Sequence, residues 1–479
     1  MGIEKIKTDR LKKLEAIKNA GIDPYPAKTW PRQNIASVLE NFEELAEKET
    51  EVVLAGRLFL VRGHGGSAFA NLKDASGQIQ IYFKKDELGE EQYKFFTDNI
   101  DVGDFLAAAG VLFKTQKGEQ TLLVKKYQLL AKALNQLPDK WHGLKDIEER
   151  FRWRELDLLM NQEAKERFKS RSRIIGDLRK FLESEGFMEV ETPILQSLPG
   201  GALAKPFTTH LNALDMDLYL RIAPELYLKR LIVGGLEKIY ELGRCFRNEG
   251  MDKSHNPDFT MLEFYWAYAD YEDLTQLTER MFEFLAPELE IEYQGQKINL
   301  MPPFKRIALR DLLLKEFDLD IDKANEKEIL KELEKRGAKL EDNKPCRAID
   351  ALFKLARPKL IQPTFVMNHP LEMSPLAKET TETGLEKRYA ERFQLIVGGL
   401  EMVNAYSELN DPIEQAKRMK EQEALHQGEA RYDKDFIEAL EYGLPPTAGW
   451  GLGVDRLIML LTNAPSMREV ILFPAMREK

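Results

Sequence analysis

This 479-residue chain has no long hydrophobic run, only two cysteines and no excess of basic residues. No apolar stretch approaches the roughly 20 residues that a bilayer span needs, and the N-terminus lacks the apolar centre of a signal peptide. The two cysteines argue against disulfides and favour a reducing compartment. The net charge of −10 argues against general adhesion to nucleic acid. We therefore expect a cytoplasmic protein with no membrane partner.

Familiar nucleotide and metal signatures are also missing. The sequence contains neither a Rossmann fingerprint nor a P-loop, and it has no Cys–His cluster with metal-ligand spacing. Its length suggests two or three domains.

The first part of the chain changes from helical to strand character. Residues 4–20 have apolar residues at helical spacing. From residue 51 to about 134, short strand-like runs are separated by turns, with one helical stretch near 87–98. About five strands in such a short span predict a small closed barrel of the OB type.

Two residues of this barrel, Phe69 and Gln80, are candidates for nucleic-acid contacts. OB barrels bind single strands by stacking bases on exposed aromatic rings, at about 1–3 kcal/mol per base. A Gln amide can both donate to and accept from a base edge. From the residues alone, Phe69 could equally be a core ring, so both interpretations stay open.

Two runs of strand character, Ile239–Arg247 and Phe259–Tyr268, flank a polar loop. This pattern predicts an antiparallel hairpin. Because side chains alternate between the faces of a strand, Phe259, Glu263 and Tyr265 share one face. On its own this is also the pattern of a solvated hairpin with a charged loop.

Residues 394–411 predict a second strand–turn–strand unit, with Asn404 and Glu408 on one face. A buried Glu408 would need a cationic partner or a proton. Glu401 faces the other way from Asn404 in an ideal strand, so both could serve one pocket only if a bulge intervened. Further on, the glycines of 443–453 predict a turn that precedes an apolar helix over 454–461.

Three segments of the chain resemble the motifs of class II aminoacyl-tRNA synthetases. FRNEG (246–250), with His255 and Phe259 after it, resembles motif 2, and GLGVDR (451–456) resembles motif 3. The helix predicted over 163–185, followed by a short strand and a proline, resembles motif 1, which builds the dimer interface of that class. The surroundings resemble the lysyl-tRNA synthetases from about residue 8 to the C-terminus.

This resemblance implies an α+β fold in which an N-terminal OB-fold β-barrel precedes a class II catalytic domain, an antiparallel β-sheet flanked by helices. The expected boundaries are a helical segment at 1–50, an anticodon-binding OB domain at 51–138, a linker at 139–160 and a catalytic domain at 161–479. A helical insertion is expected around 300–365.

The resemblance also implies an activity and its site. L-lysine would be activated by ATP, with Mg²⁺, to lysyl-adenylate and then transferred to the 3′ end of tRNA(Lys) by a homodimer. The implied catalytic residues are Arg247, Glu249, His255 and Arg456; Phe259 and Glu401 would join them in binding ATP. The implied lysine-binding residues are Gly201, Glu225, Arg247, Glu263, Tyr265, Asn404, Tyr406 and Glu408. The implied anticodon-binding residues are Phe69, Gln80 and Arg62.

One position departs from the family pattern. Where an acid would accompany Glu401 as a magnesium ligand, this chain has Gln394. An amide oxygen can coordinate Mg²⁺ but does not neutralise its charge, so one metal site is in doubt.

Three alternatives stay open. An aspartyl- or asparaginyl-type synthetase shares the architecture, but Glu408 and Tyr265 suit a cationic substrate side chain. A lysine-activating enzyme that modifies a protein would generally lack the barrel. A catalytically impaired RNA-binding or regulatory relative is supported only by Gln394.

Overall fold

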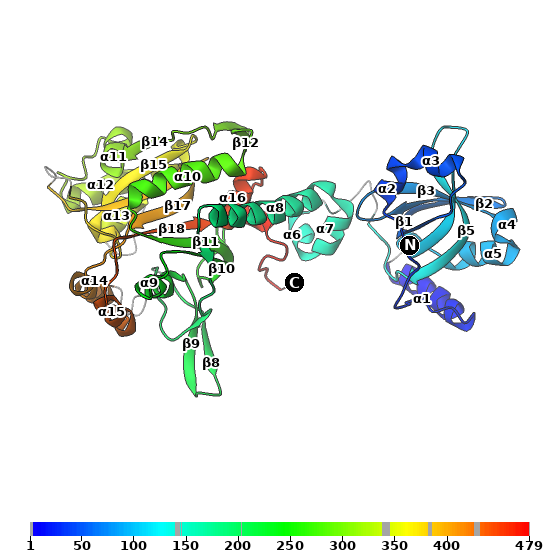
Figure 1. Ribbon diagram of the computed structural model, residues 1–479, viewed down its shortest axis with the longest axis horizontal. Helices are drawn as coiled ribbons and strands as arrows, with labels where there is room; N and C mark the ends of the chain where they lie inside the picture. Colours follow the sequence, from blue (N-terminus) through cyan, green and yellow to red (C-terminus); the bar gives the residue numbers. More distant parts are fainter. Residues whose placement is uncertain are drawn as a thin grey trace. The chain divides into compact units, whose positions relative to one another are not determined.

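The computed structural model describes residues 3–138, 144, 146–202, 204–337, 345–381, 386–425 and 432–478. The chain divides into two compact units, Met1–Leu144 and Lys145–Lys479 (Figure 1). Each has its own core, and each is described by itself below.

The first unit is a closed five-stranded barrel, which confirms the predicted OB fold. Its strands close in the order β1-β2-β3-β5-β4. Alternate residues of β2 and β3 are buried, so one face of each strand fills the barrel and the other faces outward. The strands are β1 (Val52–His64), β2 (Ser67–Lys73), β3 (Gln78–Lys84), β4 (Phe105–Lys114) and β5 (Gln120–Ala131).

Five helices accompany the barrel. The N-terminal helix and the helical stretch between the third and fourth strands were predicted from spacing, and the two short helices before the barrel fall within the helical segment expected at 1–50. The helices are α1 (Ile3–Asn19), α2 (Ile35–Glu40), α3 (Phe42–Glu47), α4 (Lys85–Leu88) and α5 (Glu90–Asn99).

The second unit is built on an eight-stranded sheet in the order β14-β15-β16-β17-β18-β11-β10-β6. Its strands are antiparallel except for the outer pairs β14–β15 and β10–β6. The predicted hairpin is present as β10 and β11, paired along their whole length. The strands are β6 (Met188–Glu189), β10 (Lys238–Phe246), β11 (Asp258–Ala267), β14 (Lys305–Ala308), β15 (Thr364–Pro370), β16 (Tyr389–Val397), β17 (Leu400–Ser407) and β18 (Thr447–Gly453).

The glycine-rich segment predicted as a turn is instead the central strand β18, between β17 and β11. Gly449, Gly451 and Gly453 fall on alternate positions and therefore on one face. A Cβ at Gly449 would lie 2.0 Å from Glu408 Oε1. Glycine is thus required by close packing on that face, and the turn prediction was wrong because glycine usually breaks strands.

Helices cover one face of this sheet (Figure 1). The core there joins α8 (Gln162–Ser184), α10 (Tyr271–Leu285) and α16 (Val454–Leu461) to inward residues of β11 such as Leu262 and Phe264. The opposite face of β11 carries Phe259, Glu263 and Tyr265. The sheet therefore has one apolar face, which packs against the helices, and one more polar face, which carries the candidate site residues.

The predicted helical insertion contains both helices and strands. The helices α11 (Leu309–Phe317), α12 (Glu326–Lys335) and α13 (Pro345–Ala356) form a separate core against β15 and β16. However, β14 and β15 belong to the main sheet, so the segment extends that sheet rather than standing apart from it.

The segment predicted as a linker, 139–160, contains α6 (Ile147–Arg152) and α7 (Arg154–Met160), which belong to the second unit. Residues 139–143 and 145 of that prediction lie outside the described residues. The remaining helices of this unit are α9 (Glu225–Val233), α14 (Pro412–Leu425), α15 (Lys434–Glu441) and α17 (Met467–Val470).

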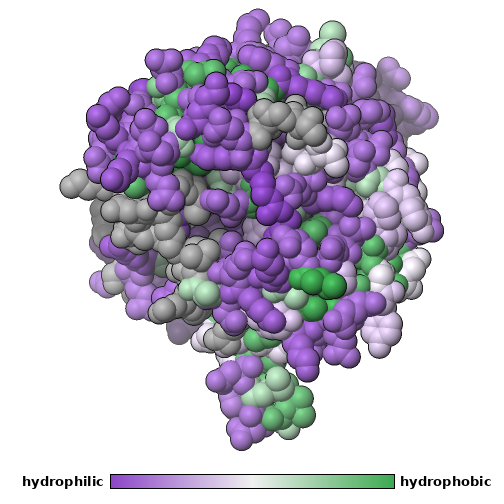
Figure 2. All heavy atoms as spheres, turned by 90° about the vertical axis from the view of Figure 1, so that its left-hand side faces the viewer, coloured by the Kyte–Doolittle hydropathy of each residue, from purple (hydrophilic) through white to green (hydrophobic). Residues whose placement is uncertain are grey.

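A small sheet projects from the second unit. Strands β7 (Leu195–Gln196), β8 (Thr208–Leu211) and β9 (Met216–Leu220) pair in the order β7-β9-β8. Figure 2 shows the projection at the bottom of this unit, with hydrophobic and hydrophilic residues side by side. Leu214, in the β8–β9 connection, is 68% exposed.

Among the described residues, no helix combines the length and the apolar character that a bilayer span requires.

Asp455 fixes the start of α16 to the start of β11. One carboxylate oxygen accepts from Arg171 Nη1 at 2.6 Å, and the other accepts from the Thr260 backbone N–H at 2.8 Å. Because Arg456 and Phe259 are the adjacent residues, this contact sets the distance between two candidate site residues.

We predict that Asp455→Asn lowers the free energy of unfolding by about 3 kcal/mol, because the amide NH₂ must face one of two donors and Arg171 loses its charged partner. Urea unfolding of the full chain measures this. Asp435→Asn is the matched control, since Asp435 occupies the first turn of α15 but is exposed. Equal effects of the two substitutions would contradict the assignment.

Candidate active site

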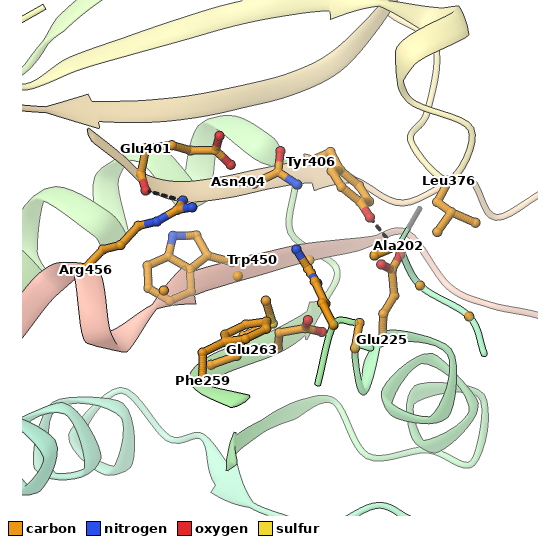
Figure 3. Close-up of a pocket in the computed structure, with 18 of the residues that line it drawn as sticks. Ala202, Glu225, Phe259, Glu263, Leu376, Glu401, Asn404, Tyr406, Trp450 and Arg456 are labelled. Atoms are coloured by element: carbon orange, nitrogen blue, oxygen red, sulfur yellow. Dashed lines mark hydrogen bonds between the residues drawn. The ribbon is translucent and has the colours of Figure 1, made fainter. Parts of the chain in front are cut away.

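A cavity of about 500 Å³ opens on the polar face of the sheet. It is lined by twelve of the residues that sequence analysis proposed for substrate binding (Figure 3). They are Gly201, Glu225, Arg247, Glu249, His255, Phe259, Glu263, Tyr265, Glu401, Asn404, Tyr406 and Arg456.

One end of the cavity holds an aromatic ring and arginines. Phe259 and Arg456 lie at this end, on opposite sides of the cavity (Figure 3). The Arg456 guanidinium is held by the Glu401 carbonyl oxygen at 3.0 Å and by His255 Nε2 at 3.1 Å. Arg247 carries its guanidinium carbon 5.1 Å from the centre of the Phe259 ring. A flat ligand at this end would meet rings and guanidinium planes, which suits an aromatic base.

The loop between β10 and β11 adds exposed polar groups. His255 Nδ1 lies 2.9 Å from Asp252, whose pKa is lowered by hydrogen bonds from Ser254 and His255 in opposition to partial burial. Glu249 is exposed at the rim. The loop therefore places a histidine and an acid beside the arginine end.

A β-bulge resolves the conflict between Glu401 and Asn404. The pairing of β17 with β16 shifts between Leu395 and Ile396, so that Met402 is the extra residue. The bulge reverses the alternation between Glu401 and Asn404, and both line the cavity.

The metal ligands expected here are only partly in place. Glu401 lines the cavity, but its Oε2 accepts from Arg357 Nη1 at 2.6 Å. Gln394 lies opposite Asn404 on β16 but is buried and does not line the cavity, and its Oε1 has no hydrogen-bond partner among the described residues. Nor do those residues group three His, Cys, Asp or Glu side chains into a metal centre. The site fits a Mg²⁺ ion carried mainly by a ligand's phosphates, with Glu401 as the protein carboxylate.

The other end of the cavity is acidic. Glu225, at the start of α9, is 4% exposed, and its Oε1 accepts from the Tyr406 hydroxyl at 2.7 Å. Gly201 adopts a φ of +85°, and a Cβ there would lie 2.9 Å from Glu225 Cβ. This glycine therefore lets the chain pass closely over the carboxylate.

Glu263 lies between the two ends and is fully buried. Burial, reinforced by Glu225, raises its pKa to about 8, although the Tyr265 hydroxyl donates to it at 3.3 Å and Arg247 lies near. The protonated form of Glu263 is therefore favoured at neutral pH. A cation arriving beside it would displace that proton.

Glu408 lies just behind the cavity lining. It is 1% exposed and forms an ion pair with Lys229, a residue of α9 that sequence analysis missed. Its Oε1 lies against Gly449 of the floor. The cation that a buried Glu408 was expected to need is therefore already supplied, at least in part, by the chain itself. The signal for Lys229 was its position four residues after Glu225 on one helix.

Arg392 is a half-buried cation of the cavity lining that sequence analysis missed. It donates to Asn404 Oδ1 at 2.9 Å, to the Met373 carbonyl at 2.8 Å and to Ser374 Oγ at 3.0 Å. It thus orients Asn404 and ties β16 to the 373–374 turn over the cavity.

The barrel presents its candidate residues on the outer face. Phe69 is half-buried there and stacks on Tyr82 with the ring centres 4.4 Å apart, so the alternative of a core ring was wrong. Gln80 Oε1 accepts a hydrogen bond from Thr121 Oγ1 at 2.9 Å, and the Gln80 NH₂ group takes no part in this hydrogen bond. Arg62 is exposed and pairs with Phe69 across β1 and β2.

Comparison with known proteins now identifies the architecture. Residues 146–477 match the family described as tRNA synthetases class II (D, K and N). The chain belongs to this class II tRNA synthetase family. Residues 52–130 match a second family, described as an OB-fold nucleic acid binding domain.

The class II assignment extends to full-length relatives. The chain is 46% identical to the lysine–tRNA ligase of Fervidobacterium nodosum, over 98% of this chain and 93% of that protein. It is 46% identical to the lysine–tRNA ligase of Thermotoga maritima, over 100% of this chain and 97% of that protein. It is 47% identical to the lysine–tRNA ligase of Bacillus subtilis, over 98% and 97%.

We predict that Glu263 makes the stability of the empty synthetase depend on pH. Its pKa is about 8 in the folded chain, against an ordinary value of 4.5. Its stabilising effect is therefore complete below pH 4.5 and is lost as the pH rises through 8. Melting temperatures between pH 5 and pH 9 should fall less for Glu263→Gln than for the unsubstituted chain.

Glu283→Gln is the control, because Glu283 is exposed on α10 and should leave the pH dependence unchanged. A pH profile for Glu263→Gln that parallels the unsubstituted chain would show that Glu263 is ionised in the empty site.

Proposed function

We propose that the chain is a lysine–tRNA ligase that activates L-lysine with ATP and transfers it to tRNA(Lys). The observation that carries lysine specificity is the acidic end of the cavity. Three buried carboxylates, Glu225, Glu263 and Glu408, gather there, and among the described residues only Lys229 forms an ion pair with any of them. Lysine, with its two ammonium groups, is the amino acid that supplies the missing positive charge.

Arg392, a cation near the acidic end, does not pair with the three acids. Arg392 directs its guanidinium to Asn404 and to the 373–374 turn rather than to the three carboxylates. An aspartate or asparagine side chain at this end would add a negative or neutral group to buried acids. The acidic end therefore disfavours the aspartyl- and asparaginyl-type alternatives.

The substrate groups follow from the chemistry of the cavity. The ε-ammonium group would be bound by Glu408 and Tyr265, with Glu263 beside them, and the α-amino group by Glu225 and Gly201. Tyr406 would lie along the aliphatic stem. Asn404, oriented by Arg392, would hold the carboxylate together with Arg247.

ATP would bind at the arginine end. Its adenine would lie between Phe259 and Arg456, with Glu249 near its amino group and His255 toward the pyrophosphate. Arg247 would then reach both the lysine carboxylate and the α-phosphate. Mg²⁺ bound with the phosphates would be held at Glu401, and it would neutralise phosphate charge.

The reaction needs position and charge compensation more than a protein base. The lysine carboxylate attacks the α-phosphorus and pyrophosphate leaves. The terminal ribose hydroxyl of the tRNA then attacks the lysyl carbonyl carbon, gives up its proton and takes the acyl group as AMP leaves. Arg247 stabilises the charge that builds on the α-phosphate during the attack.

The barrel and the surface support the remaining parts of the proposal. Phe69, Gln80 and Arg62 would contact the anticodon on the outer face of the barrel. Met188 of the motif 1 segment and Ile194 just after it are apolar and 47% and 45% exposed, which suits a homodimer interface. The cytoplasmic location expected from the low cysteine content stays a prediction.

Amino-acid-dependent ATP–pyrophosphate exchange tests the function. Exchange should depend on lysine and not on aspartate or asparagine, and charging of tRNA(Lys) should follow. Exchange without charging would indicate a lysine-activating enzyme with another acceptor. No exchange with lysine would indicate a catalytically impaired relative.

We predict that Arg247→Ala lowers the rate of lysine-dependent exchange by at least about a hundredfold, because it removes charge stabilisation from the reacting phosphate. Arg244→Ala is the matched control, since Arg244 is exposed on β10 and pairs with Asp258 at 3.2 Å. Near-normal exchange by Arg247→Ala would refute the role.

We predict that Glu408→Gln raises the KM for lysine at least about tenfold while the KM for ATP changes little, since a neutral amide cannot pair with an ammonium group. Exchange rates over both substrate concentrations measure this. Equal changes in the two KM values would remove Glu408 from the specificity site.

A further inference from the structure

Lys229 is the most completely buried ammonium group beside the cavity, and the proposed chemistry does not use it. Its side chain is 1% exposed. The Nζ atom lies 2.7 Å from Glu225 Oε1 and forms an ion pair with Glu408 Oε2. The aromatic rings of Tyr406 and Phe436 also lie near Lys229, each with its centre 5.8 Å from Nζ.

Lys229 contacts one oxygen of each carboxylate, and the other oxygen of each lies beside a glycine of the cavity lining. Glu225 Oε1 is shared by Lys229 and Tyr406, whereas Oε2 lies 3.5 Å from the position that a Cβ would take on Gly201. Glu408 Oε2 faces Lys229, whereas Oε1 lies 2.0 Å from the position of a Cβ on Gly449. Both glycines line the cavity. At each, the missing side chain makes room for that carboxylate oxygen, and Glu408 Oε1 fills this room as a buried atom just behind the lining.

The charge of Lys229 is stable in this position. Burial opposes its ammonium form, but Glu225 and Glu408 together outweigh burial and raise its pKa. Burial, with Glu225 and Glu263 nearby, raises the pKa of Glu408, and Lys229 opposes that rise. Without this cation, burial would favour the protonated form of Glu408 still more, and Glu408 would not present a charged oxygen to a ligand.

We propose that Lys229 is a positioning residue that ties Glu225 to Glu408 and so aims one oxygen of each at the two ammonium groups of the substrate. The inference rests on the proposed function, because it assigns one carboxylate to the α-amino group and the other to the ε-ammonium group. Lys229 acts through both acids and does not touch the substrate.

The test compares Lys229→Met, which removes the charge, with Lys229→Arg, which keeps it. Lys229→Met should raise the KM for lysine in pyrophosphate exchange at least about tenfold and leave the KM for ATP within about twofold. Lys229→Arg should restore part of the loss. Lys238→Met is the control, because Lys238 is a partly buried lysine whose Nζ donates to the Glu185 carbonyl instead.

Two substrate analogues separate the two ammonium sites. 6-Aminohexanoate lacks the α-amino group and norleucine lacks the ε-ammonium group, and each can compete with lysine in exchange. Lys229→Met should weaken inhibition by both, since both carboxylates lose their common cation. Weakened inhibition by one analogue alone would overturn the link between Glu225 and Glu408.

A structural role alone predicts a different result. Loss of packing would change the KM values of lysine and ATP together and lower the melting temperature, and that outcome would overturn the proposal. If Lys229→Met does not fold, Lys229→Gln provides the same comparison, because its amide can still donate to Glu225. Failure of the unsubstituted chain to show lysine-dependent exchange would instead refute the proposed function itself.

Discussion

Buried charge that must be paired organises this catalytic unit. Carboxylates are costly to remove from water, and the sheet holds several of them in one wall of a single cavity. Part of their charge is compensated within the protein, by Lys229 for Glu225 and Glu408. The remainder is compensated by a proton on Glu263 in the empty state and, in our proposal, by the substrate. Specificity for a doubly cationic amino acid thus follows from the excess negative charge of these buried acids. Such a ligand pairs with the acids that the protein itself leaves without a cation.

This arrangement depends on a sheet whose two faces have different chemistry. One face packs its apolar side chains against α8, α10 and α16, which makes the floor rigid. The other face is kept open because β18 places glycines where side chains would otherwise fill the cavity. A bulge in β17 then turns Glu401 and Asn404 to the same side. The packed apolar face keeps the sheet rigid, and the glycines leave space for a ligand on the cavity face. Both conditions are needed to hold charged groups at fixed distances from a ligand.

Sequence analysis predicted most of the residues that line the candidate site, but it missed contacts between them and their neighbours. Alternation in β11 placed Phe259, Glu263 and Tyr265 together, and the structure confirms that they share the cavity. The pairing of Glu408 with Lys229 was missed, because it joins residues almost 180 positions apart. Gln394 proved to be buried and not part of the cavity lining, which no spacing rule could show.

The sequence by itself determined the class of fold, because hydrophobic periodicity and turn residues are local signals that specify a barrel followed by a helix-covered sheet. It also determined the family, because motifs 2 and 3 keep fixed residue types at fixed spacing. Only the tertiary structure decided that the segment with Gly449 and Gly451 is a central strand rather than a turn, and which acids share a counter-ion. Both outcomes depend on what lies across the sheet, and a local sequence pattern does not give the distances between residues far apart in the chain.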